Sequence, residues 1–257
     1  MSCTEIMFKK LALATALLAG LSTAHAYQAE IGGSLLVIDP DYENADTSTG
    51  FALDGTFYFN PVQVKNSPLN EAAFLNRASN VNAAISYIDF DVAESTTFGI
   101  GVEYFVPNTD FYLSAGIGQT TIEEDGFEDF DTTTYTAEVG YLPVSGLLIA
   151  AGIAGFDNDD TDDSDATLRA KYVTQVGAYD MNFEGGVVFA DDEIFTLGTD
   201  LYLDKTFSVG LGYTDDGEDD SFQIRAKKFF NQQVSLEGSI DFGENVNVYG
   251  VRAAYRF

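Results

Sequence analysis

Acidic side chains dominate the residues of this sequence that could take part in chemistry. Aspartate and glutamate number 41, against 12 lysines and arginines, with one histidine, His25, and one cysteine, Cys3. A general base near neutral pH is normally histidine, and a covalent nucleophile needs such a base beside it. His25 and Cys3 both lie in a stretch that we expect to be removed, and nothing singles out one carboxylate pair. We therefore expect no enzyme, no disulfide and no cofactor.

The densest acidic run is the candidate for a metal site. Carboxylate oxygens are ligands that calcium prefers. However, an EF-hand loop needs glycine at its sixth position and a later glutamate, and here the sixth position is aspartate. We expect a solvated loop rather than a metal site, with loose divalent binding that bridges to lipopolysaccharide phosphates as the alternative. The acids of this run are Asp157, Asp159, Asp160, Asp162, Asp163 and Asp165.

The N-terminus has the order of a secretory signal peptide. Lys9 and Lys10 precede an apolar run over 11–21, and Ala24 and Ala26 form an Ala-x-Ala cleavage site. The apolar run is too short to span a bilayer as a helix. We expect residues 1–26 to be cleaved and residues 27–257 to form one exported domain. The net charge of −29 excludes nucleic acid as a partner.

Period-two alternation of apolar residues recurs along the whole mature chain and predicts about fourteen strands, with twelve as the alternative count. Each run has the length that a tilted strand needs to cross a membrane. Residues 68–78 are the exception and could form a helical turn or two. A break in the alternation near Ile85 and Ile88 predicts a bulge in the third strand. The expected strands are 28–39, 50–60, 80–91, 96–106, 110–122, 131–142, 146–156, 165–177, 180–190, 193–204, 205–214, 221–230, 232–242 and 246–257.

The connections between these runs differ by parity. Odd connections are acidic, as in 39–46, 123–131 and 215–220, whereas most even ones are short and nearly uncharged, as in 107–109 and 143–145. A barrel explains this difference, because odd connections lie on one rim and even ones on the other. Both termini should lie on the short-turn rim. Aromatic pairs at that end of alternate strands, such as Tyr58-Phe59 and Tyr104-Phe105, predict an aromatic girdle.

Large apolar residues occupy one face of the predicted strands and small or polar residues the other. Phe51, Leu53, Phe98 and Ile100 belong to the first face, which we expect to meet lipid. A charge on the lipid face would cost roughly 2–4 kcal/mol at the midplane, so the strand charges should point inward. They either form ion pairs that fill the interior or line a water-filled pore with a field across it. The lumen and constriction candidates are Arg169, Lys171, Arg225, Lys227, Arg252, Arg256, Glu103, Glu138, Glu184 and Asp200.

The last strand carries the most specific pattern. Tyr249, Val251, Ala253, Tyr255 and Phe257 alternate with small residues and arginines. This ending resembles the C-terminal strand of Gram-negative outer-membrane β-barrels, and the whole mature chain looks like the "putative porin" type of that class. The resemblance implies that the barrel-assembly machinery reads these residues. In general porins the third outer loop folds inward toward basic wall residues, although residues 123–131 are short for that role.

These observations predict an all-β, transmembrane, antiparallel up-and-down barrel in the outer membrane. The expected function is a porin-like channel for passive diffusion of small hydrophilic solutes. One alternative is a structural or adhesive barrel with an ion-paired, plugged lumen and acidic extracellular loops, and another is a soluble periplasmic or secreted β-protein. Lipid, lipopolysaccharide and the assembly machinery are the other expected partners. The transported solute, the oligomeric state and the place of residues 61–80 stay open.

Overall fold

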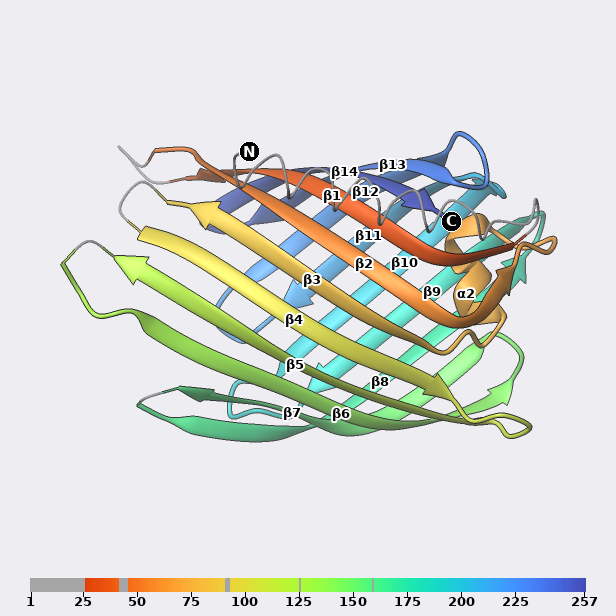
Figure 1. The fold of residues 1–257 in the computed structure, drawn as a ribbon, viewed down its shortest axis with the longest axis horizontal. Helices are drawn as coiled ribbons and strands as arrows, with labels where there is room; N and C mark the ends of the chain where they lie inside the picture. The colour runs from red at the N-terminus through yellow and green to blue at the C-terminus, as the bar shows by residue number, and fades with distance from the viewer. Residues whose placement is uncertain (1–25, 42–45, 91–92, 125, 159) are drawn as a thin grey trace, which may run out of the picture.

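The protein is a closed barrel of fourteen antiparallel strands in the computed structural model (Figure 1), which describes residues 26–257 except 42–45, 91–92, 125 and 159. Each strand pairs with its neighbours in the sequence, and β1 pairs with β14 to close the cylinder. The predicted fold class and the larger strand count are therefore confirmed. The strands are β1 (Ala26–Pro40), β2 (Ser48–Gln63), β3 (Asn80–Asp89), β4 (Ala93–Phe105), β5 (Phe111–Glu124), β6 (Phe130–Val144), β7 (Leu147–Asn158), β8 (Asp162–Val176), β9 (Tyr179–Val188), β10 (Ile194–Asp204), β11 (Phe207–Asp215), β12 (Asp220–Phe229), β13 (Val234–Gly243) and β14 (Val246–Arg256).

The register is regular around most of the cylinder. The third strand, β3, pairs without interruption with both β2 and β4, so the predicted bulge there is wrong. Tyr87 points outward beside Phe51, with ring centroids 5.5 Å apart, and Ile88 simply occupies an inward position near the strand end. Register shifts occur instead next to short-turn connections, between Tyr27 and Ala29 and between Tyr141 and Val144, for example.

The outward face is apolar along the full circumference. Leu35, Phe98 and Val251 are each exposed over half or more of their surface, as are many other aliphatic and aromatic residues on outward positions. In water such a surface would be unfavourable, whereas hydrocarbon tolerates it. Among the described residues, no helix has the length and hydropathy needed to cross a membrane.

The two rims differ as the sequence indicated. The odd connections lie at one mouth, which we call the acidic rim, and the even connections at the other, the short-turn rim. Gln28 donates its backbone N–H to the carbonyl of Phe257, so the start of β1 and the C-terminus meet at the short-turn rim. Figure 1 shows the C-terminus at the right-hand mouth, close to α2.

The connection between β2 and β3 is the longest described feature outside the strands. It contains a 3₁₀ turn, η2 (Leu69–Glu71), followed by one turn of α-helix, α2 (Ala72–Leu75). The expected helical turns in 68–78 are thus present. We call residues 64–79 the lumen segment, because Leu69, Glu71 and Ala72 are buried at the short-turn mouth rather than displayed outside it.

Candidate functional site in the barrel lumen

The seam that closes the barrel carries the densest group of ion pairs. Arg252 on β14 donates to Asp54 on β2 at 2.5 Å and to Glu30 on β1 at 3.1 Å. Arg256, two inward positions nearer the short-turn rim, donates to the other oxygen of Glu30 at 2.5 Å. These residues lie side by side because inward positions on paired strands face each other in register. The closing strands are therefore joined by charge as well as by backbone hydrogen bonds.

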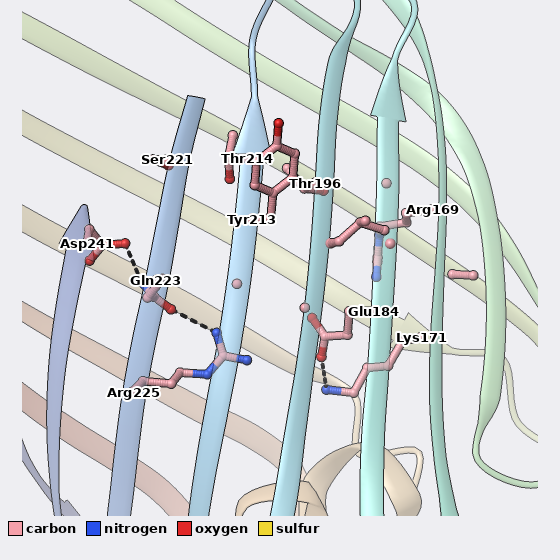
Figure 2. A pocket seen from close by; sticks show the side chains of 16 residues that line it. Arg169, Lys171, Glu184, Thr196, Tyr213, Thr214, Ser221, Gln223, Arg225 and Asp241 are labelled. Carbon is pink, nitrogen blue, oxygen red and sulfur yellow. Dashed lines mark hydrogen bonds and ion pairs between the residues drawn. The ribbon is translucent and has the colours of Figure 1, made fainter. Parts of the chain in front are cut away.

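The same pairing continues along the later strands. Arg225 on β12 makes a two-pronged contact with Asp200 on β10, with nitrogen–oxygen distances of 3.0 and 2.8 Å. Lys227 pairs with Glu237 at 3.1 Å. Figure 2 shows Gln223 between Asp241 and Arg225, donating to the aspartate at 2.7 Å and accepting from the guanidinium at 2.8 Å. Arg225 and Lys227 are thus each paired with one carboxylate, whereas Asp241 contacts the neutral amide of Gln223.

Arg169 and Lys171 on β8 complete the set of basic candidates. Arg169 holds Glu138 with both Nε and Nη2 and also donates to the Tyr112 hydroxyl at 3.2 Å. Lys171 contacts Glu184 at 2.7 Å (Figure 2). Every basic candidate of the sequence analysis therefore points inward and is ion-paired. Local ion pairs, one of the two interpretations offered for these charges, are present in the structure, and a water-filled pore with a field across it stays a prediction.

Inward glycines make room for these long side chains. A Cβ on Gly32 would collide with Arg252 and Asp54, and a Cβ on Gly210 would collide with Asp200 and Arg225. Any larger residue would push the guanidinium groups away from their carboxylates. Glycine at these positions therefore determines how closely the charges lie against the wall.

The lumen segment crosses the short-turn mouth and reaches strands on other sides of the barrel. Leu69 donates its backbone N–H to the backbone carbonyl of Lys205 at 2.8 Å. The carbonyl of Leu69 accepts a hydrogen bond from the Arg256 guanidinium at 2.9 Å. Glu71 is only 2% exposed, and it accepts from the Tyr202 hydroxyl at 2.5 Å and from Lys171 at 3.0 Å. A buried carboxylate is costly unless it is paired in this way.

Apolar contacts hold the helical turn of the lumen segment. Ala72 packs in a cluster with Tyr27, Tyr58 and Val62. Phe74 packs against a second cluster, which consists of Phe105, Tyr112, Leu142 and Leu148. The segment is thus fixed by side chains of β1, β2 and β4–β7 as well as by the polar contacts of Glu71.

The aromatic pairs at the short-turn rim serve two purposes. In each pair one residue points outward, as Phe59 and Tyr104 do, and can belong to a membrane girdle. Its neighbour points inward and is buried, as Tyr58 and Phe105 are. The girdle prediction therefore describes only half of each pair, because successive strand residues face opposite sides. The inward half packs against the lumen segment or Arg256.

Strands β3 to β7 present a different interior, which we call the small-residue wall. Asn82, Thr97, Gly99, Gly116 and Thr136 are among the inward residues that line a cavity of about 460 Å³ along it. By contrast, the ion-paired wall consists of the inward residues of β8–β14, β1 and β2. A smaller cavity of about 240 Å³ lies along the ion-paired wall, where Lys171, Glu184 and Arg225 line it, so the small-residue wall faces the larger of the two spaces.

Carboxylates crowd the acidic rim. In the β11–β12 connection, the backbone N–H groups of Asp219 and Glu218 donate to Asp216, and these bonds lower the pKa of its carboxyl. Within the described residues no group of three or more acids, histidines or cysteines is placed to hold a metal ion. Of the acidic run considered for calcium, Asp159 lies outside the described residues, and Asp162, Asp163 and Asp165 belong to β8.

The comparison with protein families agrees with this architecture. The sequence profile of a family described as "Putative general bacterial porin" matches residues 8–149, more than half of the chain. The chain belongs to this family. It is a channel of the Gram-negative outer membrane for small solutes, and its fold and family are those of a channel rather than an enzyme.

Solved structures support the same assignment. The outer membrane protein Omp33 of Acinetobacter baumannii is 27% identical, with a TM-score of 0.75, over 91% of this chain and 100% of that one. The CymD monoaromatic hydrocarbon channel shares the fold at 9% identity and a TM-score of 0.57, covering 90% and 89% of the two chains. A mutant of the TodX monoaromatic hydrocarbon channel is 9% identical with a TM-score of 0.55, over 93% of this chain and 91% of that one. No curated protein matches significantly.

The third outer connection is short in this porin, as the sequence indicated. Glu123 and Glu124 belong to β5 and Asp131 to β6, leaving a connection of residues 125–129, of which 125 is outside the described part. Phe127 in this connection donates its backbone N–H to the carbonyl of Glu124 at the end of β5, and its side chain is 72% exposed. The inserted element comes from the opposite rim, from the β2–β3 connection.

The proposed assembly signal occupies the outer face of β14. Tyr249, Val251 and Tyr255 are exposed there, at 41%, 53% and 37%, and Ala253 is exposed too, whereas Phe257 is buried and packs edge-on against Tyr255. Recognition by assembly machinery stays a prediction. So does the signal peptide, since residues 1–25, including Ala24, lie outside the described part and only Ala26 is within it.

Sequence reasoning missed several residues that shape this lumen. Glu71 was assigned to a connection of open location, Tyr202 was counted with the aromatic girdle, and Tyr112 was not singled out. The aromatic pairs could have indicated an element inside the barrel, because one residue of each pair had to point inward and needed a partner to pack against. The buried Asn182, which donates to Glu184 at 2.7 Å, gave no such signal.

Proposed function

We propose that this porin passes small hydrophilic solutes by passive diffusion along the small-residue wall. The observation that carries the proposal is the contrast between an apolar outer surface and an interior lined by hydroxyl, amide and charged groups beside open space. Water fills such an interior readily, because every charged group in it is solvated or paired. The outer rows are proposed to meet lipid and lipopolysaccharide.

Cations should be the favoured ions. Lys171 is shared by two carboxylates, Glu71 and Glu184. At the seam, by contrast, Arg252 and Arg256 balance Glu30 and Asp54. In addition, Glu103 and Asp241 have hydrogen-bond donors but no cation within ion-pair distance among the described residues. The inner surface thus carries an excess of negative charge, and the acidic rim adds to it. Such a field concentrates cations at the entrance.

The lumen segment is proposed to limit flow at the short-turn mouth. The buried Glu71 of this segment accepts a hydrogen bond from Tyr202 of β10 and forms an ion pair with Lys171 of β8. Removing these two contacts should let the segment move out of the mouth and widen the solute path. The structural or adhesive alternative would keep the same ion-paired interior permanently closed.

Planar-bilayer conductance of refolded protein tests the channel and the segment together. Glu71→Ala should give larger or more frequent conductance steps than the native chain, and Tyr202→Phe, which removes one hydroxyl, should give a smaller increase. Lys228→Ala is the control, because its ion pair with the exposed Asp204 lies outside the lumen segment. Unchanged, featureless traces from native and Glu71→Ala protein, with folding shown by heat-dependent gel migration, would favour the structural barrel.

A further inference from the structure

Glu103 differs from the other acidic candidates of the lumen. Glu30, Glu138, Glu184 and Asp200 each contact an arginine or lysine. Glu103 lies on β4, and among the described residues no cation comes within ion-pair distance of it. Its position, two residues from the end of β4, places it near the short-turn mouth beside the packing site of Phe74.

Two buried donors hold the Glu103 carboxylate in place. The Tyr112 hydroxyl donates to Oε1 at 2.6 Å, and the Asn80 amide donates to Oε2 at 2.8 Å. Tyr112 is 1% exposed and Asn80 4% exposed, so neither donor is free to move away. Each carboxylate oxygen has a second lone pair. The charge is therefore oriented but keeps acceptor capacity toward the lumen.

The space in front of Glu103 is the 460 Å³ cavity of the small-residue wall. Ser114 and Asn82 add polar atoms to its lining, and glycines leave its surface smooth. Arg169 also borders the cavity, but Glu138 already binds its guanidinium through two nitrogens. An anion would therefore have to compete with a formed ion pair, whereas a cation at Glu103 would not.

We propose that Glu103 forms a binding subsite for small solutes that carry an ammonium group. A divalent metal would need several carboxylates, and no cluster of three potential metal ligands occurs in the described chain. An ammonium group needs one carboxylate and one or two neutral acceptors, which Glu103 and Ser114 provide. The inference rests on the proposed solute path, since the subsite is reached through the open side of the lumen.

Ligand-observed NMR on the full chain, refolded into lipid nanodiscs, tests this subsite. Ethanolammonium is the probe, and ethylene glycol is the uncharged molecule of similar size. We expect the native protein to bind ethanolammonium but not ethylene glycol. Glu103→Gln should weaken binding on the order of tenfold, because a charge-assisted hydrogen bond is replaced by a neutral one.

Asp241→Asn is the matched control, because it removes another lumen carboxylate without a described cation partner, close to the acidic rim. It should leave the affinity within about twofold, since screening weakens charge effects beyond the Debye length of roughly 8–10 Å. Equal losses in the two variants, or no binding to folded native protein, would overturn the proposal. Conductance of the same samples separates the cases: binding without conductance disproves only the channel, and conductance without binding disproves only the subsite.

Discussion

The two walls of the lumen use the same strand geometry in opposite ways. On the ion-paired wall, Arg225 and Arg252 lie over Gly210 and Gly32, and their guanidinium groups fill the space that the glycines leave. On the small-residue wall, Gly99 has only one atom, the carbonyl oxygen of Ile117 at 3.8 Å, near the place where a Cβ would lie. Inward glycine therefore has two roles: Gly32 and Gly210 accommodate a long neighbouring side chain, and Gly99 leaves open space.

The difference follows from what each wall has to join. The ion-paired wall includes the seam between β14 and β1, where strands from the two ends of the chain must stay together. Strands β3 to β7 are consecutive and are joined to one another by short connections. Extra side-chain contacts therefore stabilise the seam, and the consecutive strands can leave their interior open.

The largest expected effect on stability comes from a substitution at the seam between β14 and β1. Arg256→Ala should lower the free energy of unfolding by about 3–5 kcal/mol, because Glu30 loses a buried partner and Leu69 an anchor. Thr136→Ala, on the small-residue wall, should change it by less than about 0.5 kcal/mol. Heat-dependent gel migration across a urea series measures both. Equal midpoints for the two variants would remove the distinction between the walls.

A second prediction concerns glycine alone. Gly32→Ala should destabilise the barrel by about 1–3 kcal/mol, because the new methyl group displaces Arg252 from Asp54. Gly99→Ala should be nearly neutral, since its Cβ would meet only an ordinary van der Waals contact. The same urea series compares the pair. If Gly99→Ala is the more damaging of the two, the open side of the lumen has been misassigned.

The smallest expected effect is on ion selectivity. The carboxylates at the acidic rim are exposed, so salt should screen them, and ion-paired groups in the lumen should respond less. We expect the cation preference from reversal potentials to fall by less than half between about 0.1 M and 1 M salt, where the Debye length shortens from roughly 10 to 3 Å. Complete loss of preference at high salt would assign selectivity to the rim alone.

Much of the barrel could be predicted from local pattern. The period-two alternation of residues such as Phe98, Ile100 and Val102 predicted both the strands and their outward face, because a strand has only two sides. Inward placement of Arg169 and Arg225 followed from the cost of charge in hydrocarbon. The β3 bulge was wrongly predicted because one inward isoleucine near a strand end was taken for a break in register.

The order of side chains along the chain thus already determined the closed cylinder, its apolar exterior and its polar interior. Each of these depends on neighbours one or two residues apart. The pairing of Arg252 with Asp54, the burial of Glu71 against Tyr202 and the free face of Glu103 were decided only by the folded barrel. These contacts join residues far apart in sequence, and register and lumen width, which no local pattern encodes, determine which of them form.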